Sequence, residues 1–300
     1  MKGGRFPAYG WAGLLGMVAV QILLASGSPI AATWLTPLMW TGYILTADAA
    51  AHVRGGEAWL VTRRREFPFL VLISVAVWLG FEAYNLHLRN WAYAGIPTDP
   101  WLRGLGYFWS FATIMPGVFV TASLLKTLRR PTSRRRPVVP LPTFPSALAF
   151  LSGAAMVTLP VLVPPSTAAY LFAPVWIGFL LVLDPINHKL GVPSLWARWR
   201  AGDRWAVGDL LAAGLACGFL WEAWNWQAFQ AGGGHWVYTI PDALRLFGLH
   251  FGQMPLLGLL GFPPFALELF AAYGFFRAAL GGDRFFGTPA PAAPGRSQRR

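Results

Sequence analysis

The sequence has little charge, few acidic residues and almost no cysteine. Only 12% of its 300 residues are charged, against roughly 25% in an average soluble domain. The single cysteine, Cys217, excludes a disulfide within the chain. The sequence also lacks a glycine-rich phosphate loop, a Cys/His cluster, a His-Glu-x-x-His run and a serine-nucleophile motif. These absences disfavour the chemistries of soluble enzymes.

Long hydrophobic runs take the place of charge. Hydrophobic residues make up 55% of the chain, and a helix needs about 20 apolar residues to cross roughly 30 Å of hydrocarbon. We therefore predict an all-α, polytopic integral membrane protein with about nine transmembrane helices. The predicted helices lie near residues 11–28, 30–52, 67–87, 102–126, 145–163, 166–186, 207–229, 243–260 and 262–281.

The chain also repeats itself. The motif Trp-x-Gly-x5-Asp-x3-His begins at Trp40 and again at Trp176, and a Glu-Ala-aromatic-Asn motif begins at Glu82 and again at Glu222. Trp-x-Tyr and Met-Pro pairs follow in both copies. We predict two tandem four-helix repeats plus one extra helix. The predicted segments are a first repeat at 1–128, a basic Pro-rich linker at 129–143, a second repeat at 144–261, a ninth helix at 262–286 and a disordered tail at 287–300.

Basic residues gather in three loops on one side of the predicted helices, after the second, fourth and sixth runs. The positive-inside rule makes these loops and the N-terminus cytoplasmic, in an inner membrane. The net charge of +12 is then an orientation signal, and we expect membrane lipid rather than nucleic acid as the partner. Nine spans would leave the basic tail outside, which favours a broken or re-entrant eighth run as an alternative.

An acidic residue and a histidine share one helical face near the inner interface in each repeat. Asp48 precedes His52 by four residues, and Asp184 precedes His188 by four. If both copies converge, these side chains are candidate ligands for a divalent metal. We favour a structural role instead, in which each Asp pairs with a neighbouring arginine, such as Arg54, Arg63 or Arg198. The sequence does not indicate which cofactor, if any, the protein uses.

The placement of Asp48 and Asp184 after the second and sixth helices resembles the membrane prenyltransferase superfamily. Its members have nine helices in two four-helix halves and bind a metal diphosphate through Asp-rich motifs at these positions. The resemblance implies a metal-dependent transferase that acts on an isoprenoid diphosphate.

Near the outer face each repeat carries a buried carboxylate. Glu82 and Glu222 lie within helices, each followed three residues later by an asparagine, Asn85 or Asn225. Burying a carboxylate costs several kcal/mol unless it is protonated or paired. We expect the two glutamates to face one another across the repeat interface, with each asparagine as orienter. His250 is a candidate third member of this layer.

Aromatic residues surround these carboxylates, and we expect several to form the wall of a binding site. An acid lined by aromatic rings can protonate an alkene and stabilise the carbocation, or bind an organic cation. The same residues can equally form an interfacial belt or a satisfied bundle core. The candidate wall residues are Trp78, Trp91, Tyr93, Trp221, Trp224, Trp236 and Tyr238.

The second copy also resembles the lycopene cyclase domain family of carotenoid synthesis. The matching residues are Trp221-Glu222, Trp236-Val-Tyr238, Met254-Pro255 and Glu268. The resemblance implies acid-catalysed cyclisation of an isoprenoid. Glu268 then has a catalytic or proton-relay role, although it could instead pair with a basic residue at the inner interface.

These patterns favour a membrane-embedded enzyme that acts on a hydrophobic, isoprenoid-like lipid. Glu82, Glu222 and Glu268 are its candidate acids and bases. One alternative is a carrier or channel for a small cation or a proton-coupled solute, in which the same carboxylates bind the cargo. Another is a membrane assembly or scaffold protein. The sequence leaves open whether the protein is an enzyme.

Overall fold

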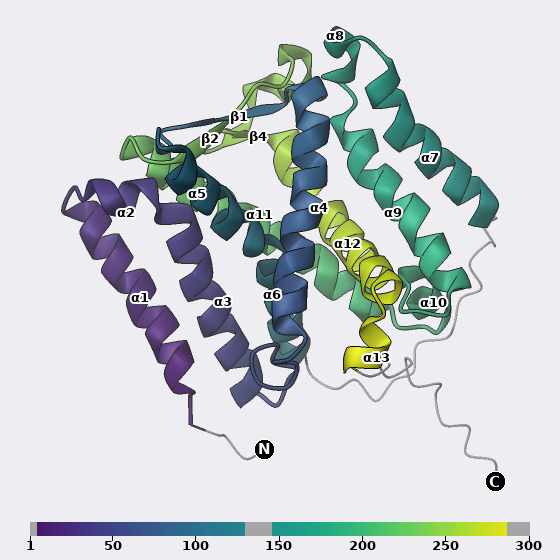
Figure 1. The fold of residues 1–300 in the computed structure, drawn as a ribbon, viewed down its shortest axis with the longest axis horizontal. Helices are drawn as coiled ribbons and strands as arrows, with labels where there is room; N and C mark the ends of the chain where they lie inside the picture. The colour runs from purple at the N-terminus through teal and green to yellow at the C-terminus, as the bar shows by residue number, and fades with distance from the viewer. Residues whose placement is uncertain (1–4, 130–145, 287–300) are drawn as a thin grey trace.

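The computed structural model describes residues 5–129 and 146–286. Its first half contains five longer helices and a short one, and it ends before the predicted linker (Figure 1). Most of the predicted linker and the whole tail after residue 286 lie outside the described residues. The elements of the first half are α1 (Ala8–Ala25), α2 (Pro29–Thr33), α3 (Leu35–Val53), α4 (Phe67–Leu88), β1 (Trp91–Ala94), α5 (Pro100–Ala112) and α6 (Ile114–Leu128).

The second half follows the same order up to its first strand, His235–Tyr238, with one added short helix, Leu195–Arg200. From there 3-10 turns and two-residue strands replace the helix that corresponds to α5. Its elements are α7 (Ser146–Leu162), α8 (Pro165–Ala168), α9 (Phe172–Lys189), α10 (Leu195–Arg200), α11 (Arg204–Gln230), β2 (His235–Tyr238), η1 (Asp242–Leu244), η2 (Leu246–Gly248), β3 (His250–Phe251), β4 (Met254–Pro255), α12 (Leu256–Ala279) and α13 (Gly282–Phe286).

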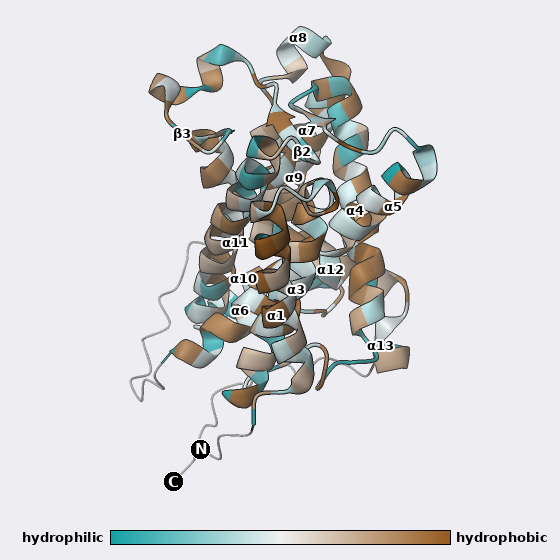
Figure 2. Cartoon of the chain, turned by 90° about the vertical axis from the view of Figure 1, so that its left-hand side faces the viewer, coloured by the Kyte–Doolittle hydropathy of each residue, from teal (hydrophilic) through white to brown (hydrophobic). Residues whose placement is uncertain are grey.

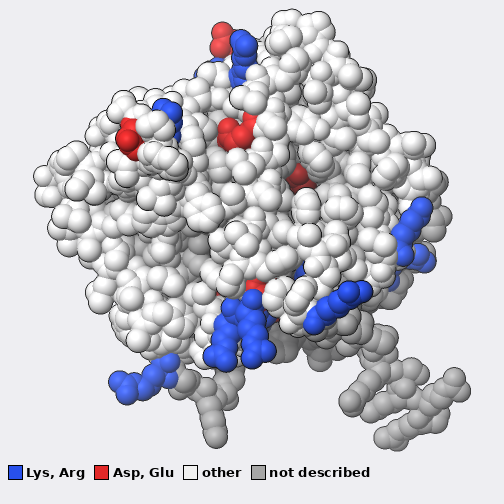
Figure 3. Space-filling view, viewed as in Figure 1, with Lys and Arg blue, Asp and Glu red and all other residues white. Residues whose placement is uncertain are grey.

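The long helices run up and down side by side, so the connections gather at two ends (Figure 1). We call the end with the α3–α4 connection, α10 and α13 the basic end, because Lys and Arg gather there in Figure 3. We call the opposite end, which carries β1 and β2, the ribbon end. Hydrophobic residues occur along all the long helices (Figure 2). Five described segments are long and apolar enough to cross a membrane: α1, α4, α5 with α6, α11 and α12.

The prediction of separate eighth and ninth helices is wrong. Residues 256–279 form one helix, α12, which passes through the predicted boundary at 261/262. Pro263 and Pro264 lie inside this helix and, lacking N–H groups, remove two helical hydrogen bonds without ending it. The preceding residues of the eighth run are irregular. Helix α12 therefore leads from the ribbon end back to the basic end (Figure 1).

Glycine pairs bring the first two long helices of each half into close contact. A Cβ atom on Gly13 would lie 2.5 Å from the carbonyl oxygen of Gly42, and one on Gly153 would lie 2.7 Å from that of Gly178. Both distances are too short for any side chain. Gly42 and Gly178 are the glycines of the repeated Trp-x-Gly motif, so the motif keeps α1 against α3 and α7 against α9.

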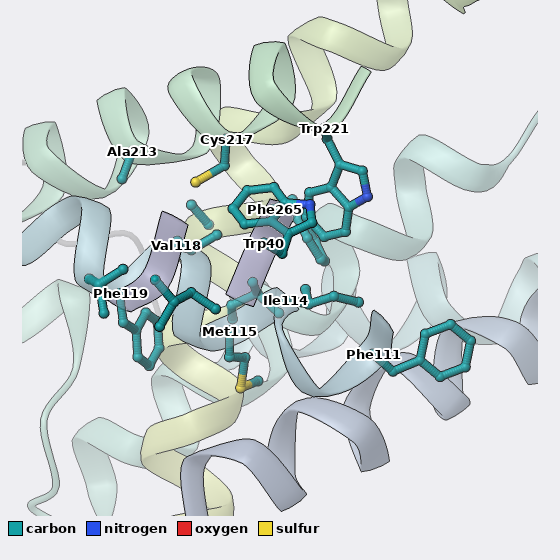
Figure 4. Close-up of a cluster of buried hydrophobic side chains, with 14 of the residues drawn as sticks. Trp40, Phe111, Ile114, Met115, Val118, Phe119, Ala213, Cys217, Trp221 and Phe265 are labelled. Atoms are coloured by element: carbon teal, nitrogen blue, oxygen red, sulfur yellow. The ribbon is translucent and has the colours of Figure 1, made fainter. Parts of the chain in front are cut away.

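The tryptophans of the same motif point to the molecular centre. Each packs over a glycine in the last long helix of its own half, α6 or α12. The Trp40 ring covers Gly117, and the Trp176 ring covers Gly261. Figure 4 shows the rings of Trp40, Trp221 and Phe265 close together in the core. Trp40 and Trp221 have ring centroids 5.1 Å apart in an edge-on arrangement, which is favourable for aromatic pairs.

The two halves are joined at the ribbon end by an antiparallel pair of strands. The register places Trp91 opposite Tyr238, Ala92 opposite Val237 and Tyr93 opposite Trp236. These strands are the repeated Trp-x-Tyr motifs, which the sequence did not predict as strands. The pairing is symmetric around Ala92 and Val237, because the Trp of each motif lies opposite the Tyr of the other. The ribbon therefore brings the two repeated motifs side by side.

Candidate aromatic chamber and its carboxylates

An aromatic chamber of about 150 Å³ lies beneath the ribbon, between the two halves. Six of the seven predicted wall residues line it, together with residues of α3, α5, α9 and α12 and of the neighbouring connections. Arg103 is the only Lys, Arg, Asp or Glu among the described residues that line the chamber. The predicted residues in the wall are Trp78, Trp91, Tyr93, Trp221, Trp236 and Tyr238.

Glu82 lies behind the chamber wall and is held by three aromatic donors. The Tyr93 hydroxyl donates to Glu82 Oε1 over 2.6 Å, and the Nε1 atoms of Trp78 and Trp91 donate to the same oxygen over 2.9 and 3.1 Å. Hydrogen bonds to a charged acceptor are about twice as strong as neutral ones. The carboxylate therefore fixes three rings of the wall while it does not itself line the chamber.

Glu222 occupies the equivalent position in the second half, but both of its oxygens are used. Oε1 accepts the backbone N–H of Gln253 over 2.6 Å, and Oε2 accepts from the Tyr238 hydroxyl over 3.1 Å and from Asn225 Nδ2 over 3.3 Å. The side chain is fully buried, with 0% exposure. The turn at Gly252 and Gln253 covers it, so Glu222 also reaches the chamber only through a tyrosine.

The asparagines mainly hold the turns that lead into the ribbon. Asn85 Oδ1 accepts the N–H groups of Asn90 and Trp91, and its Nδ2 donates to the Trp91 carbonyl. Asn225 makes the same pair of bonds to the main chain of Trp236. Between the described residues Glu82 and Asn85 there is no hydrogen bond, so the prediction that Asn85 orients Glu82 is wrong.

The two tyrosines that connect the carboxylates to the chamber keep their protons. Burial, and then the neighbouring Glu82, raise the pKa of Tyr93 well above its usual value. Burial and Glu222 act in the same way on the pKa of Tyr238. Each hydroxyl therefore remains a hydrogen-bond donor to its carboxylate, and each Tyr–Glu pair is a short path for a proton between the chamber and the acid behind its wall.

Three predicted site residues lie elsewhere. Trp224 packs behind Trp40, with ring centroids 5.0 Å apart, and does not line the chamber. His250 is exposed in β3, where its Nδ1 lies 2.9 Å from the Gly252 carbonyl, because the eighth run is a loop at this position. Glu268 lies midway along α12 rather than near its end, and it is 1% exposed.

Glu268 also lacks the basic partner that one interpretation gave it. No described residue makes a hydrogen bond or an ion pair with Glu268, and its Oε2 is a buried oxygen without a partner. The structure does not bring Glu268 into the chamber wall.

At the basic end, Asp48 and Asp184 accept hydrogen bonds from backbone N–H groups of turns and do not pair with arginines. Asp48 accepts the N–H of Trp59 over 2.6 Å, and Asp184 accepts the N–H of Leu195 over 2.7 Å. The prediction of arginine partners is therefore wrong. Across residues 5–129 and 146–286, no group of three or more His, Cys, Asp or Glu side chains could hold a metal ion, and His52 and His188 are in no such group.

Sequence reasoning missed a buried ion cluster that joins the halves at this end. Glu66, just before α4, accepts from Arg277 Nε over 2.7 Å and from Arg63 Nη2 over 2.8 Å, and also from the Tyr273 hydroxyl. Burial alone would raise its pKa, but Tyr273 and the two arginine charges outweigh it and lower the pKa of Glu66. Arg129 and Asp209 form a second ion pair between the halves.

Comparison with known proteins gives no relative from which a function could be transferred. No family model, no curated protein and no solved structure matches the chain. The resemblances to the lycopene cyclase domain family and to the membrane prenyltransferase superfamily thus stay predictions. The function has to be argued from the chamber and its carboxylates.

Proposed function

We propose that the chain crosses an inner membrane eight times, with the basic end in the cytoplasm, and that its halves are related by a pseudo-two-fold axis along the membrane normal. The eight crossings are α1, α3, α4, α5 with α6, α7, α9, α11 and α12. Equivalent contacts in the two halves support the repeat: the Gly13–Gly42 and Gly153–Gly178 contacts, and the strand register about Ala92 and Val237. The positive-inside rule supports the orientation.

We further propose a membrane-embedded enzyme that acts on a hydrophobic, isoprenoid-like lipid. One observation carries this proposal: an aromatic chamber has two carboxylates behind its walls, half-buried Glu82 and fully buried Glu222, each linked to the wall by a tyrosine hydroxyl. Aromatic faces stabilise a cation, and the negative charges behind them strengthen that effect in a low-dielectric site. An apolar chamber of this kind suits a substrate that becomes positively charged during the reaction.

The two Tyr–Glu pairs suggest how an isomerising cyclisation would proceed. One pair, in its protonated form, adds a proton to a double bond and leaves a carbocation. A second double bond of the same molecule attacks the cation and closes a ring, and the other pair removes a proton. The product is then an isomer of the substrate, and no oxidant or reductant is needed. Trp78 and Trp221, stacked 6.2 Å apart, would flank the cation.

Lipid extracts test this proposal. Cells that make polyene isoprenoids and express the chain should accumulate a lipid of unchanged mass and altered retention in chromatography coupled to mass spectrometry. Tyr93→Phe combined with Tyr238→Phe should abolish this product, because both proton paths lose their hydroxyl. Tyr43→Phe is the matched control, since Tyr43 bonds Thr121 and lies outside the chamber wall. An unchanged isoprenoid profile on expression of the wild-type chain would refute the proposal.

A carrier for a small cation is the second candidate, and the basic end favours it. The Glu66–Arg277 and Arg129–Asp209 ion pairs close the space between the halves on that side, as a gate would in an alternating-access carrier. Uptake of a radiolabelled organic cation into proteoliposomes would distinguish the two. A carrier should accumulate the cation and leave the lipid profile unchanged.

A further inference from the structure

A second hollow, of about 420 Å³, lies between α4 and α5 on the outer side of the chamber wall. Tyr93, Tyr107 and Phe111 line both spaces, so a single layer of rings separates them. Leu79 and Phe108 also line the hollow and are 53% and 48% exposed. The hollow therefore opens sideways, through the apolar flank of the helices.

Glu82 is the only charged residue among the described residues that line this hollow. Its three hydrogen bonds all go to Oε1. Oε2 has no partner among the described residues, and it is not one of the buried unpaired atoms. This oxygen is thus open to the hollow. In Figure 3 acidic atoms are visible on this face, among uncharged surface near the ribbon end.

A carboxylate oxygen without a partner, between aromatic and aliphatic walls, favours a positively charged ligand, because a charge placed among apolar groups needs a partner. Within the described chain no Lys, Arg or His makes an ion pair with Glu82. We propose that the hollow is a binding site for an organic cation, an ammonium group on an apolar body. The carboxylate would pair with the ammonium, and the rings of Tyr107 and Phe111 would lie against the cation. The apolar body would occupy the sideways opening.

Among the described residues of the second half, Glu222 lines no such hollow, which supports a specific role for the first half. The turn at Gly252 and Gln253 fills the corresponding space, and the Gln253 N–H occupies Glu222 Oε1. The site shares Glu82 with the reaction proposed above but lies on the other side of the ring layer, so binding of a ligand there can be measured without turnover. It would serve equally as the entry site of a carrier or as a regulatory site of an enzyme.

Binding of two matched probes to the purified protein in a neutral maltoside detergent tests the site. The probes are 11-bromoundecylammonium and 11-bromoundecanol, whose bromine quenches tryptophan fluorescence and which differ only in the head group. We expect saturable binding, with the ammonium bound about tenfold more tightly than the alcohol. Glu82→Gln should remove this preference, because the amide still accepts at the Oε1 position and presents N–H groups to the hollow.

A glycine pair supplies the control for folding. A Cβ on Gly104, in the hollow, and one on Gly80, on the exposed side of α4, would each meet no atom within 4 Å. Gly104→Leu should fill the hollow and weaken both probes about tenfold, while Gly80→Leu should leave both unchanged. Equal binding of the two probes by the wild-type protein, non-saturable partitioning alone, or an unaltered response in Gly104→Leu would overturn the proposal.

Discussion

Glu82 and Glu222 occupy equivalent positions in the two halves, and each is followed by a Trp-x-Tyr strand. Their surroundings differ because of what the chain does after that strand. The first half continues into α5, which leaves a hollow beside Glu82. The second half folds back in 3-10 turns and places Gln253 on Glu222. The same acid is therefore open in one half and closed in the other, which shows that duplicated residues need not keep the same role.

The length of one connection explains this difference. From Tyr93 to Met115 the chain advances 22 positions (115 − 93), whereas from Tyr238 to Met254 it advances 16 (254 − 238). The shorter connection has no room for a helix like α5. It crosses close to the carboxylate instead, where Gly252, with a φ of +59°, leaves only 2.5 Å between a Cβ position and Glu222 Oε1. The turn can cover Glu222 only because residue 252 is a glycine, whereas Glu82 has no such turn against it.

The largest loss of stability should come from replacing Glu66, a buried acid that pairs with two arginines. Glu66→Gln leaves Arg277 and Arg63 without their buried counter-charge, which costs about 3–5 kcal/mol of unfolding free energy. Glu57→Gln is the control, because Glu57 is 45% exposed and pairs only with Arg63; such a surface pair contributes about 1 kcal/mol or less. Thermal unfolding in detergent at pH 7 measures both.

The stability difference between wild type and Glu66→Gln should also depend on pH in a defined direction. The pKa of Glu66 is lower in the folded protein than its ordinary value of 4.5, so the folded state favours the ionised form. Its contribution to stability is complete above that ordinary value and is lost as the pH falls through the lowered pKa. The difference between wild type and Glu66→Gln should therefore shrink in acid. A difference that stays constant down to the lowest pH would contradict the assigned ion pairs.

A smaller loss of stability should distinguish Glu222 from Glu82, the two repeated glutamates. In Glu222→Gln the new NH2 group must face either the Gln253 N–H or the donors Asn225 and Tyr238, and the unpaired donor costs about 1–3 kcal/mol. In Glu82→Gln the carbonyl oxygen can take over all three bonds, so we expect a loss under about 1 kcal/mol. Chemical unfolding of both variants measures the difference. Equal losses would show that the two acids are equally enclosed.

Sequence patterns predicted those parts of the molecule that depend on local repetition. The apolar runs predicted most of the long helices, and the repeated motifs pointed to the chamber wall at Trp78, Trp91, Trp221 and Trp236. The missed features depend on long-range packing. Glu66 meets Arg277 across 211 positions (277 − 66), and nothing in either segment indicates the partner. The run 243–260 was predicted as a helix because hydropathy alone cannot distinguish an apolar helix from an apolar turn.

The Trp-x-Gly motifs show where a signal was present but incompletely interpreted. Their glycines repeat because α1 and α7 approach too closely for a side chain, and their tryptophans repeat because Gly117 and Gly261 lie opposite. Trp40 and Trp176 also line the chamber and could have been placed among the wall residues from the motif alone. Arg103 and Tyr107 could not, since α5 has no counterpart in the second half.

The smallest difference in stability should be that between variants of Asp184 and Asp48, the two aspartates at the basic end. Asp184 uses both oxygens on backbone N–H groups, Oδ1 on Leu195 and Oδ2 on Trp196, so Asp184→Asn must leave one N–H facing an NH2 group. Asp48 accepts its backbone N–H groups on Oδ1 and the Tyr9 hydroxyl on Oδ2, and that hydroxyl can rotate and accept instead. We expect Asp184→Asn to lose about 1 kcal/mol more than Asp48→Asn. Thermal unfolding with metal analysis of the same samples decides between the two interpretations of this layer. A stoichiometric divalent ion that disappears in Asp48→Asn would replace the turn-holding role with the metal site that the prenyltransferase resemblance implies.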